Sequence, residues 1–206
     1  MKTKALSYAF LIIAIGLGFY LYRSVKGPIE EKERIEKAEA KVIDKLVIIR
    51  EAEKAFIKTK GSYAGKWEEL IAFVDNGIMY NVQIREVTHP RKDRPWLGDS
   101  IAFIPDTLEI LKARDVINQE LKKHHSKTGR DLTQFDSKNL LYKPESNEKF
   151  ELYAGKIKIG GVMVDIIEVK DKNPIDKTRT EDNQITNRRP LGFGSRDEVS
   201  TSGNWE

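Results

Sequence analysis

The chain has 206 residues, with 36 Lys and Arg against 32 Asp and Glu and a net charge of +4. Most basic runs are interrupted by Asp or Glu, which excludes the clustered basic surface of a nucleic-acid-binding protein, so no nucleic acid partner is expected. Since there is no cysteine, disulfides and thiolate metal sites are excluded as well.

The N-terminal segment predicts a membrane anchor. Residues 5–22 contain no charge, and 18 helical residues span about 27 Å, close to the hydrocarbon thickness of a bilayer. Tyr20 and Tyr22 suit one membrane interface, and Lys2 and Lys4 flank the other end. A cleaved signal peptide would have a shorter apolar run and a small-x-small cleavage site. A buried core helix is the third alternative, and the retained anchor, residues 1–26 in the lipid bilayer, is favoured.

The orientation of the anchor is argued from its flanks. Counting Lys and Arg on both sides favours a cytoplasmic domain, because the C-terminal flank carries more of them. A very short basic N-terminal stub is, however, typical of signal-anchors whose domain is translocated. We expect a single-pass protein whose domain lies outside the cytoplasm.

Residues 27–60 predict an amphipathic stalk helix. Gly27-Pro28 suggests a bend before the first turn, and the charged residues that follow are spaced for i,i+4 ion pairs. The apolar positions repeat with a mean spacing near 3.5 residues, the coiled-coil period. They are Ile35, Ala38, Val42, Leu46, Ile49, Ala52 and Phe56. Either the stripe forms a homo-oligomer or another partner contact through the stalk, or its second half packs on its own domain.

Small residues in the anchor form a second predicted contact. Ala14, Gly16 and Gly18 would allow another membrane helix to approach closely. Together with Ile35, Val42, Leu46 and Ile49 of the stalk, they are the predicted sites of association.

Residues 61–169 predict an α+β head with a small antiparallel sheet and one packed short helix. Gly61 is the expected end of the stalk helix, and residues 66–75 predict a short amphipathic helix with Trp67, Leu70 and Val74 on its apolar face. Strands are expected at 79–87, 100–104 and 140–143. Residues 108–125 are ambiguous: 108–113 could form a strand and 116–123 a helix.

The strongest local prediction in the head is a hairpin of residues 149–159 and 162–169. Gly160-Gly161 between the two β-rich runs supplies the positive φ angles of a tight turn. We expect the helix at 66–75 to pack against this hairpin, and most of its second strand to be buried.

The composition changes after Lys170. Residues 170–206 are polar and predict an irregular tail, either docked or disordered. Trp205 in this setting is unusual, and it is either an anchor for a partner's pocket or a residue that lies on its own domain.

Catalytic and cofactor motifs are absent from the sequence. The three histidines, His89, His124 and His125, have no zinc-binding spacing, and no P-loop, dinucleotide-binding or nucleophile-elbow motif occurs. We expect no enzyme, no cofactor and no metal.

The segment from Arg50 to Val74 resembles a type IV pilin or type II secretion pseudopilin. Those proteins similarly end a long helix with an alanine-and-aromatic stretch, a Gly-x-Tyr turn and a short leucine-bearing helix. The matching residues here are Ala52, Ala55, Phe56, Gly61, Tyr63 and Leu70. The prepilin cleavage signal does not match, since Gly18-Phe19 lies inside the apolar run. The whole chain is also similar to uncharacterised single-pass envelope proteins of Gram-negative bacteria. This resemblance implies a protein of the inner (cytoplasmic) membrane with its domain in the periplasm.

These observations predict a non-enzymatic, membrane-anchored envelope protein that binds or organises membrane or periplasmic protein partners. Two alternatives stay open: an accessory subunit of a larger envelope machine, such as a secretion system or an ion-driven motor, and a periplasmic enzyme or ligand-binding protein.

Overall fold

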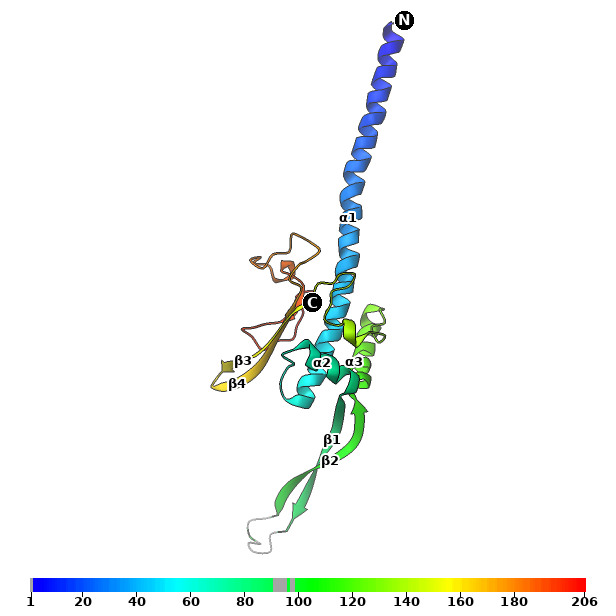
Figure 1. The fold of residues 1–206 in the computed structure, drawn as a ribbon. Coiled ribbons are helices and arrows are strands. Elements are labelled where there is room, and N and C mark those ends of the chain that lie inside the picture. The colour runs from blue at the N-terminus through cyan, green and yellow to red at the C-terminus, as the bar shows by residue number, and fades with distance from the viewer. Residues whose placement is uncertain (1, 91–95, 97–98) are drawn as a thin grey trace.

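The computed structural model describes residues 2–90, 96 and 99–206, and it is an α+β structure built around one long helix (Figure 1). Helix α1 (Lys2–Lys60) runs without a break through Gly27 and Pro28. The expected bend is therefore absent: Pro28 removes one helical hydrogen bond, and this stretch is exposed, so water can hydrate the freed carbonyl. The anchor and the stalk are one continuous helix.

Helix α1 ends where the sequence predicts. Gly61 has a φ of +79°, the left-handed conformation that glycine adopts without strain, and its N–H donates to the carbonyl of Ile57 at 2.8 Å. Helix α2 (Trp67–Asn76) follows the turn, with Leu70, Phe73 and Val74 buried. Its main neighbours are α1, α3 (Ala113–Thr128) and the short 3-10 helix η2 (Ser137–Asn139), not the hairpin after residue 149 as expected.

Two separate antiparallel sheets complete the fold. Strands β1 (Ile78–His89) and β2 (Ser100–Lys112) form a long two-stranded ribbon. Strands β3 (Glu151–Ile159) and β4 (Val162–Lys170) form the predicted hairpin, with Gly160 and Gly161 both at positive φ. The expected strand at 140–143 is reduced to a single bridge between Tyr142 and Lys149.

Only half of β4 is buried, which corrects the expectation for this strand. Val162 and Met163 at the turn are exposed, whereas Ile166, Ile167 and Val169 are buried. The turn end of the hairpin extends beyond the core, so these first residues have no neighbour to cover them (Figure 1).

The polar tail is docked on the head. Strand β5 (Gly192–Gly194) pairs antiparallel with β4 as the third strand of the sheet, and the short 3-10 helix η3 (Thr186–Arg188) precedes it. Leu191 and Phe193 are 2% exposed and lie in the core, whereas Ile185 and Val199 of the tail are exposed. The polar composition of the tail does not distinguish docking from disorder, because docking depends on a few buried side chains such as Leu191 and Phe193.

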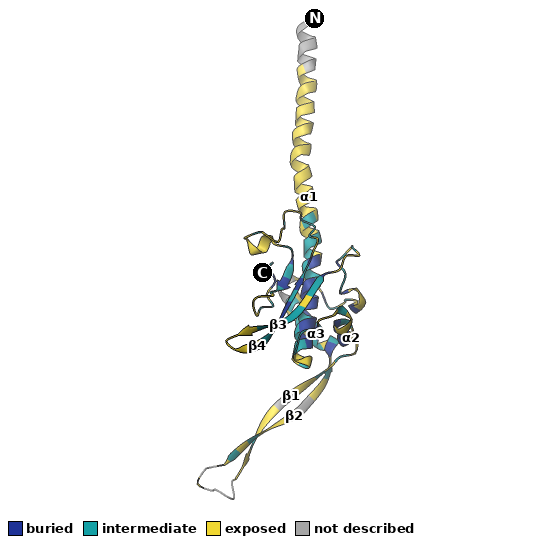
Figure 2. Ribbon diagram, turned by 60° about the vertical axis from the view of Figure 1, so that its left-hand side comes forward, coloured by how far each residue is buried: buried dark blue, intermediate teal, exposed yellow. Residues whose placement is uncertain are grey.

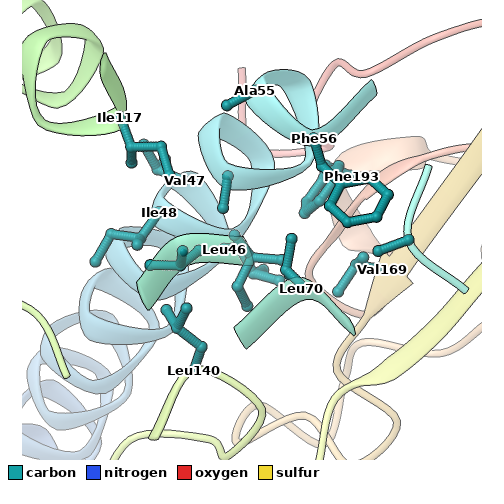
Figure 3. Packing of buried hydrophobic residues seen from close by; sticks show 14 of the residues in the cluster. Leu46, Val47, Ile48, Ala55, Phe56, Leu70, Ile117, Leu140, Val169 and Phe193 are labelled. Atoms are coloured by element: carbon teal, nitrogen blue, oxygen red, sulfur yellow. The ribbon is translucent and has the colours of Figure 1, made fainter. Parts of the chain in front are cut away.

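The core surrounds the C-terminal half of α1. Val42, Leu46, Ile49 and Ala52 are at most 1% exposed, and α2, α3 and the β3–β4–β5 sheet contribute the side chains that cover them (Figure 3). The predicted division between a stalk of residues 27–60 and a head beginning at residue 61 is therefore not seen, because the second half of the helix is the centre of the head. The N-terminal part of α1 from Phe10 to Arg34 protrudes and is exposed throughout (Figure 2).

Candidate functional site: the apolar face of the β1–β2 arm

The ribbon of β1 and β2 projects from the head as an arm. Its base is fixed by the N–H of Ala113, which donates to the carbonyl of Gly77 at 2.9 Å, and by the half-buried side chain of Met79 against the core. Beyond the base no other element covers the described part of the ribbon, and both views show it extending alone from the molecule (Figures 1 and 2). The arm is therefore the part of the head with the most free surface.

The pairing register sorts the side chains of the arm onto two faces. Residues directly opposite each other in an antiparallel pair share a face, and successive residues alternate. Tyr80 pairs with Ile110, Ile84 with Pro105, and Glu86 with Phe103. The register shifts between Asn81 and Val82, so that Leu108 has no partner on β1.

This bulge decides the character of the arm. Before it, the even-numbered Ile110 of β2 shares a face with the even-numbered residues of β1, and after it the odd-numbered Pro105, Phe103 and Ile101 do so. Without the shift, those three side chains would lie on the opposite face, since a slip of one residue inverts a strand.

One face of the arm is consequently rich in apolar side chains, and we call it the arm face. Its large apolar side chains are 49% to 65% exposed. They are Ile78, Tyr80, Ile84, Ile101, Phe103 and Ile110. The register also places Glu86, Thr88 and Lys112 on this face, opposite Phe103, Ile101 and Ile78. The opposite face mixes polar side chains, such as Asn81, Asp106 and Glu109, with apolar ones, including Ile104, which is 41% exposed.

An amphipathic ribbon with an uncovered apolar face is costly in water. A two-stranded hairpin by itself is marginally stable, and it becomes stable when a third strand or a packed surface covers its apolar side. If each of the six side chains presents on the order of 100 Å², the arm face offers about 600 Å², at the upper end of the patches found on monomeric proteins. Patches of this size mark binding surfaces, so the arm face is the candidate site.

The arm lies at the opposite end of the molecule from the N-terminus of α1 (Figure 1). Helix α1 is the one helix in the described part of the chain that is long and apolar enough to cross a membrane, by length and composition. From Arg23 to Lys60 the helix rises about 57 Å, and twelve strand residues add about 40 Å. The far end of the described strands can thus lie up to about 97 Å from the end of the apolar segment.

The small residues predicted as an association site do not form one surface. Successive residues of an α-helix are rotated by about 100°, so Ala14 and Gly18 share a face of α1, whereas Gly16 points nearly the opposite way. All three are exposed, and no atom lies within 4 Å of the position where a Cβ would stand at Gly16 or Gly18. A helix can approach either side, and the three residues cannot contact one helix together.

The stalk stripe is also corrected. Val42, Leu46 and Ile49 were expected to be open to a partner, but they are at most 1% exposed because α2, α3 and the tail pack around them. Ile35 is half-buried beside Pro28 and Asp176 at the entrance to the head. The alternative in which the second half of the helix packs on its own domain is the one observed.

Trp205 belongs to the interior contacts of the chain. Its ring packs against the core, and the guanidinium of Arg50 lies 5.8 Å from the ring centroid. A Cβ at Gly203 would stand 2.4 Å from the indole, so the tail turns closely around this ring. Of the two alternatives for Trp205, the one observed is that its side chain lies on its own domain, where the ring contacts the core and not a partner.

A polar groove lies between β4, β5 and the tail and is the alternative candidate site. Its charged side chains are joined to one another: Arg196 donates to Glu168 at 2.7 Å and to Glu151 at 2.9 Å, and Lys170 pairs with Glu181 at 2.8 Å. Paired, exposed charges of this kind form a solvated surface network. Among the described residues, no group of His, Asp and Glu is arranged to hold a metal ion.

Glu53 is the most perturbed acid of the head. Its side chain is buried, Oε2 accepts a hydrogen bond from the N–H of Ala64 at 3.0 Å, and Oε1 has no hydrogen-bond partner among the described atoms. Burial raises its pKa to about 8, against the smaller opposing effect of the Ala64 N–H. The carboxyl fastens the turn after α1 and lines none of the surface grooves described above, so its role is structural.

Comparisons with known proteins add no relative. No family model, no curated protein and no solved structure matches this chain, so the arguments for its function depend on its own geometry.

Proposed function

We propose that this protein is a membrane-anchored, non-enzymatic binding protein that holds the arm face away from the bilayer and binds a protein partner there. The observation that carries the proposal is the row of large apolar side chains around Ile84 and Phe103 on one face of the ribbon, which no other element covers in the part of the arm that the structure describes. Aromatic and branched aliphatic side chains on a flat ribbon are suited to packing against another protein surface.

The N-terminal part of α1 supports anchoring. Its apolar residues, for example Leu11, Ile13 and Leu17, are 56% to 58% exposed, and no residue in the most apolar stretch of the helix is buried by the rest of the chain. A bilayer is the solvent that would cover them. In this proposal residues 5–22 span the inner membrane, and the head lies in the periplasm because a long domain follows a short basic stub.

The stretch between membrane and head is built as a solvated spacer. Ion pairs at i,i+3 or i,i+4 spacing line it, including Arg34 with Glu31 at 2.6 Å and Lys26 with Glu30 at 3.4 Å. The head begins where Arg179 binds Glu39 with two hydrogen bonds of 2.5 and 2.9 Å. Such a helix keeps the head at a fixed distance from the membrane, which suits a protein that presents a surface to partners.

Location and orientation are tested with single cysteines, since the chain has none of its own. Asn147→Cys places a thiol in an exposed turn of the head, and Arg85→Cys places one on the face of the arm opposite the arm face. We expect the protein in the membrane fraction and both thiols labelled by a membrane-impermeant maleimide once the outer barrier is permeabilised. Labelling only after the inner membrane is lysed would overturn the orientation, and recovery in the soluble fraction would overturn the anchor.

Binding by the arm face is tested with Phe103→Asp, which places a charge at its centre, and with Arg85→Asp as the matched control on the opposite face. Crosslinking of whole membranes is expected to yield an adduct with wild type and Arg85→Asp and to lose it with Phe103→Asp. An adduct that is unaffected by Phe103→Asp would place the binding surface elsewhere.

A further inference from the structure

We infer that the arm face is covered by the arm face of a second copy of this chain, so that two ribbons pack face to face as a four-stranded sandwich. The inference rests on the proposed function for the same site and names its partner. It is carried by three properties of the described arm: its orientation relative to α1, the area of its face, and its charge.

The first property is orientation. The arm continues away from the C-terminal end of α1 (Figures 1 and 2), so two copies anchored in one membrane would hold their arms at the same height and pointing the same way. A two-fold axis along the membrane normal then brings identical faces together, which is the isologous contact of most homodimers. In that arrangement β1 of one copy lies opposite β2 of the other, and Tyr80 faces the level of Ile110.

The second property is area. A standard protein interface buries roughly 800 Å² on each partner. The six large side chains of the arm face supply about 600 Å² of this, and the exposed backbone and Pro105 add to it. Two facing ribbons at the usual spacing of about 10 Å between packed sheets would bury this area in one step. A second copy is therefore a sufficient partner without further surface.

The third property is charge. The arm face carries one acidic and one basic residue among the described residues. They are Glu86, opposite Phe103, and Lys112, opposite Ile78. Two faces without net charge do not repel each other, whereas a strongly charged face would favour a partner of the opposite sign.

The test uses one thiol per chain in native membranes. Ile84→Cys lies in the middle of the arm face at a position that is 65% exposed, so the change should not disturb folding. Arg85→Cys is the next residue and lies on the opposite face. A short bifunctional maleimide should join Ile84→Cys chains into a product of twice the chain mass and leave Arg85→Cys chains single.

Each other result overturns the inference in a distinguishable way. A product of Ile84→Cys with a mass other than twice the chain would show a different protein on the face, and the proposed function would stand. Absence of a product from Ile84→Cys would overturn the second copy as the partner, because two facing arms would bring the two thiols together. The proposed function would then be decided by the loss or survival of the wild-type adduct in Phe103→Asp. Equal dimer from both variants would show random collision or an edge contact.

Full-length protein in detergent provides the independent measurement. Wild type should sediment as a dimer, and Phe103→Asp should weaken dimerisation at least about 30-fold, the effect expected for an anchor at the centre of an interface. Arg85→Asp should leave it unchanged. A dimer that survives Phe103→Asp, or a monomeric wild type, overturns the inference.

Discussion

Arg50 on α1 and Glu206, the last residue of the chain, form an ion pair with 2.6 Å between Nη1 and Oε1. The Arg50 side chain is 9% exposed and that of Glu206 is 46% exposed. Burial by itself would raise the pKa of Glu206, but the hydrogen bond and charge of Arg50, with the Gly203 N–H, outweigh it and lower this pKa. The pair ties the end of the tail to the central helix.

Glu206→Gln should therefore destabilise the head by about 1 kcal/mol, the cost of weakening a half-exposed pair. Because the folded state lowers the pKa of Glu206, this contribution is present above the unfolded pKa and is lost as pH falls through the folded pKa. Urea unfolding at neutral and acid pH measures both the destabilisation by Glu206→Gln and its dependence on pH. Glu36→Gln, in an exposed stalk pair with Lys32, is the control with almost no expected effect. Equal effects of the two changes would mean that the tail is not held by Arg50.

Glu53 should make the free energy of unfolding depend on pH with the opposite sign to Glu206. Its pKa is about 8 in the fold and near 4.5 in the unfolded chain, so the free energy of unfolding should decrease as pH rises between these values. At pH 7 the free energy of unfolding should be about 3 kcal/mol lower than at acid pH, where Glu53 is protonated in both states. Glu53→Gln cannot ionise, so it should flatten this slope and exceed wild type in stability near pH 8. Glu68→Gln on the exposed side of α2 should keep the wild-type slope, and parallel curves for Glu53→Gln and wild type would contradict the assignment.

Leu70 tests the core around α2. Since Leu70 has no exposed surface and packs among α1, α3 and η2, Leu70→Ala should cost about 2 to 5 kcal/mol of unfolding free energy. Ile159→Ala, at the exposed end of β3, removes a similar side chain outside the core and should cost less than about 0.5 kcal/mol. A loss below about 0.5 kcal/mol for Leu70→Ala would remove α2 from the core.

Removal of the N-terminus tests the independence of the head. The side chains from Phe10 to Lys26 are exposed, so deletion of residues 2–26 should yield a soluble protein with the unfolding midpoint of the full chain. Deletion of residues 2–40 also removes Glu39, the partner of Arg179, and should lower the midpoint measurably. Chemical denaturation of both fragments checks this, and a large loss already at residue 26 would show that the apolar segment supports the head.

Several local elements could be predicted from the sequence alone. Uncharged residues 5–22, the stop at Gly61, the apolar face of α2 and the Gly160-Gly161 turn each specify a structure through periodicity or backbone freedom, and the structure has the predicted helix, helix end, buried helix face and turn there. For the anchor, the structure shows a helix that is long and apolar enough to cross a membrane by length and composition.

Which apolar residues face inward depends on contacts between distant segments, which local sequence patterns do not show. The stripe through Val42, Leu46 and Ile49 has the same spacing whether its neighbours are another chain or the head, and the choice depends on distant segments such as Leu191 and Phe193. The arm face could not be predicted from the sequence for a different reason. The residues of β2 that share this face change from even-numbered to odd-numbered at Leu108, and this bulge is recognised only from the pairing of β2 with β1.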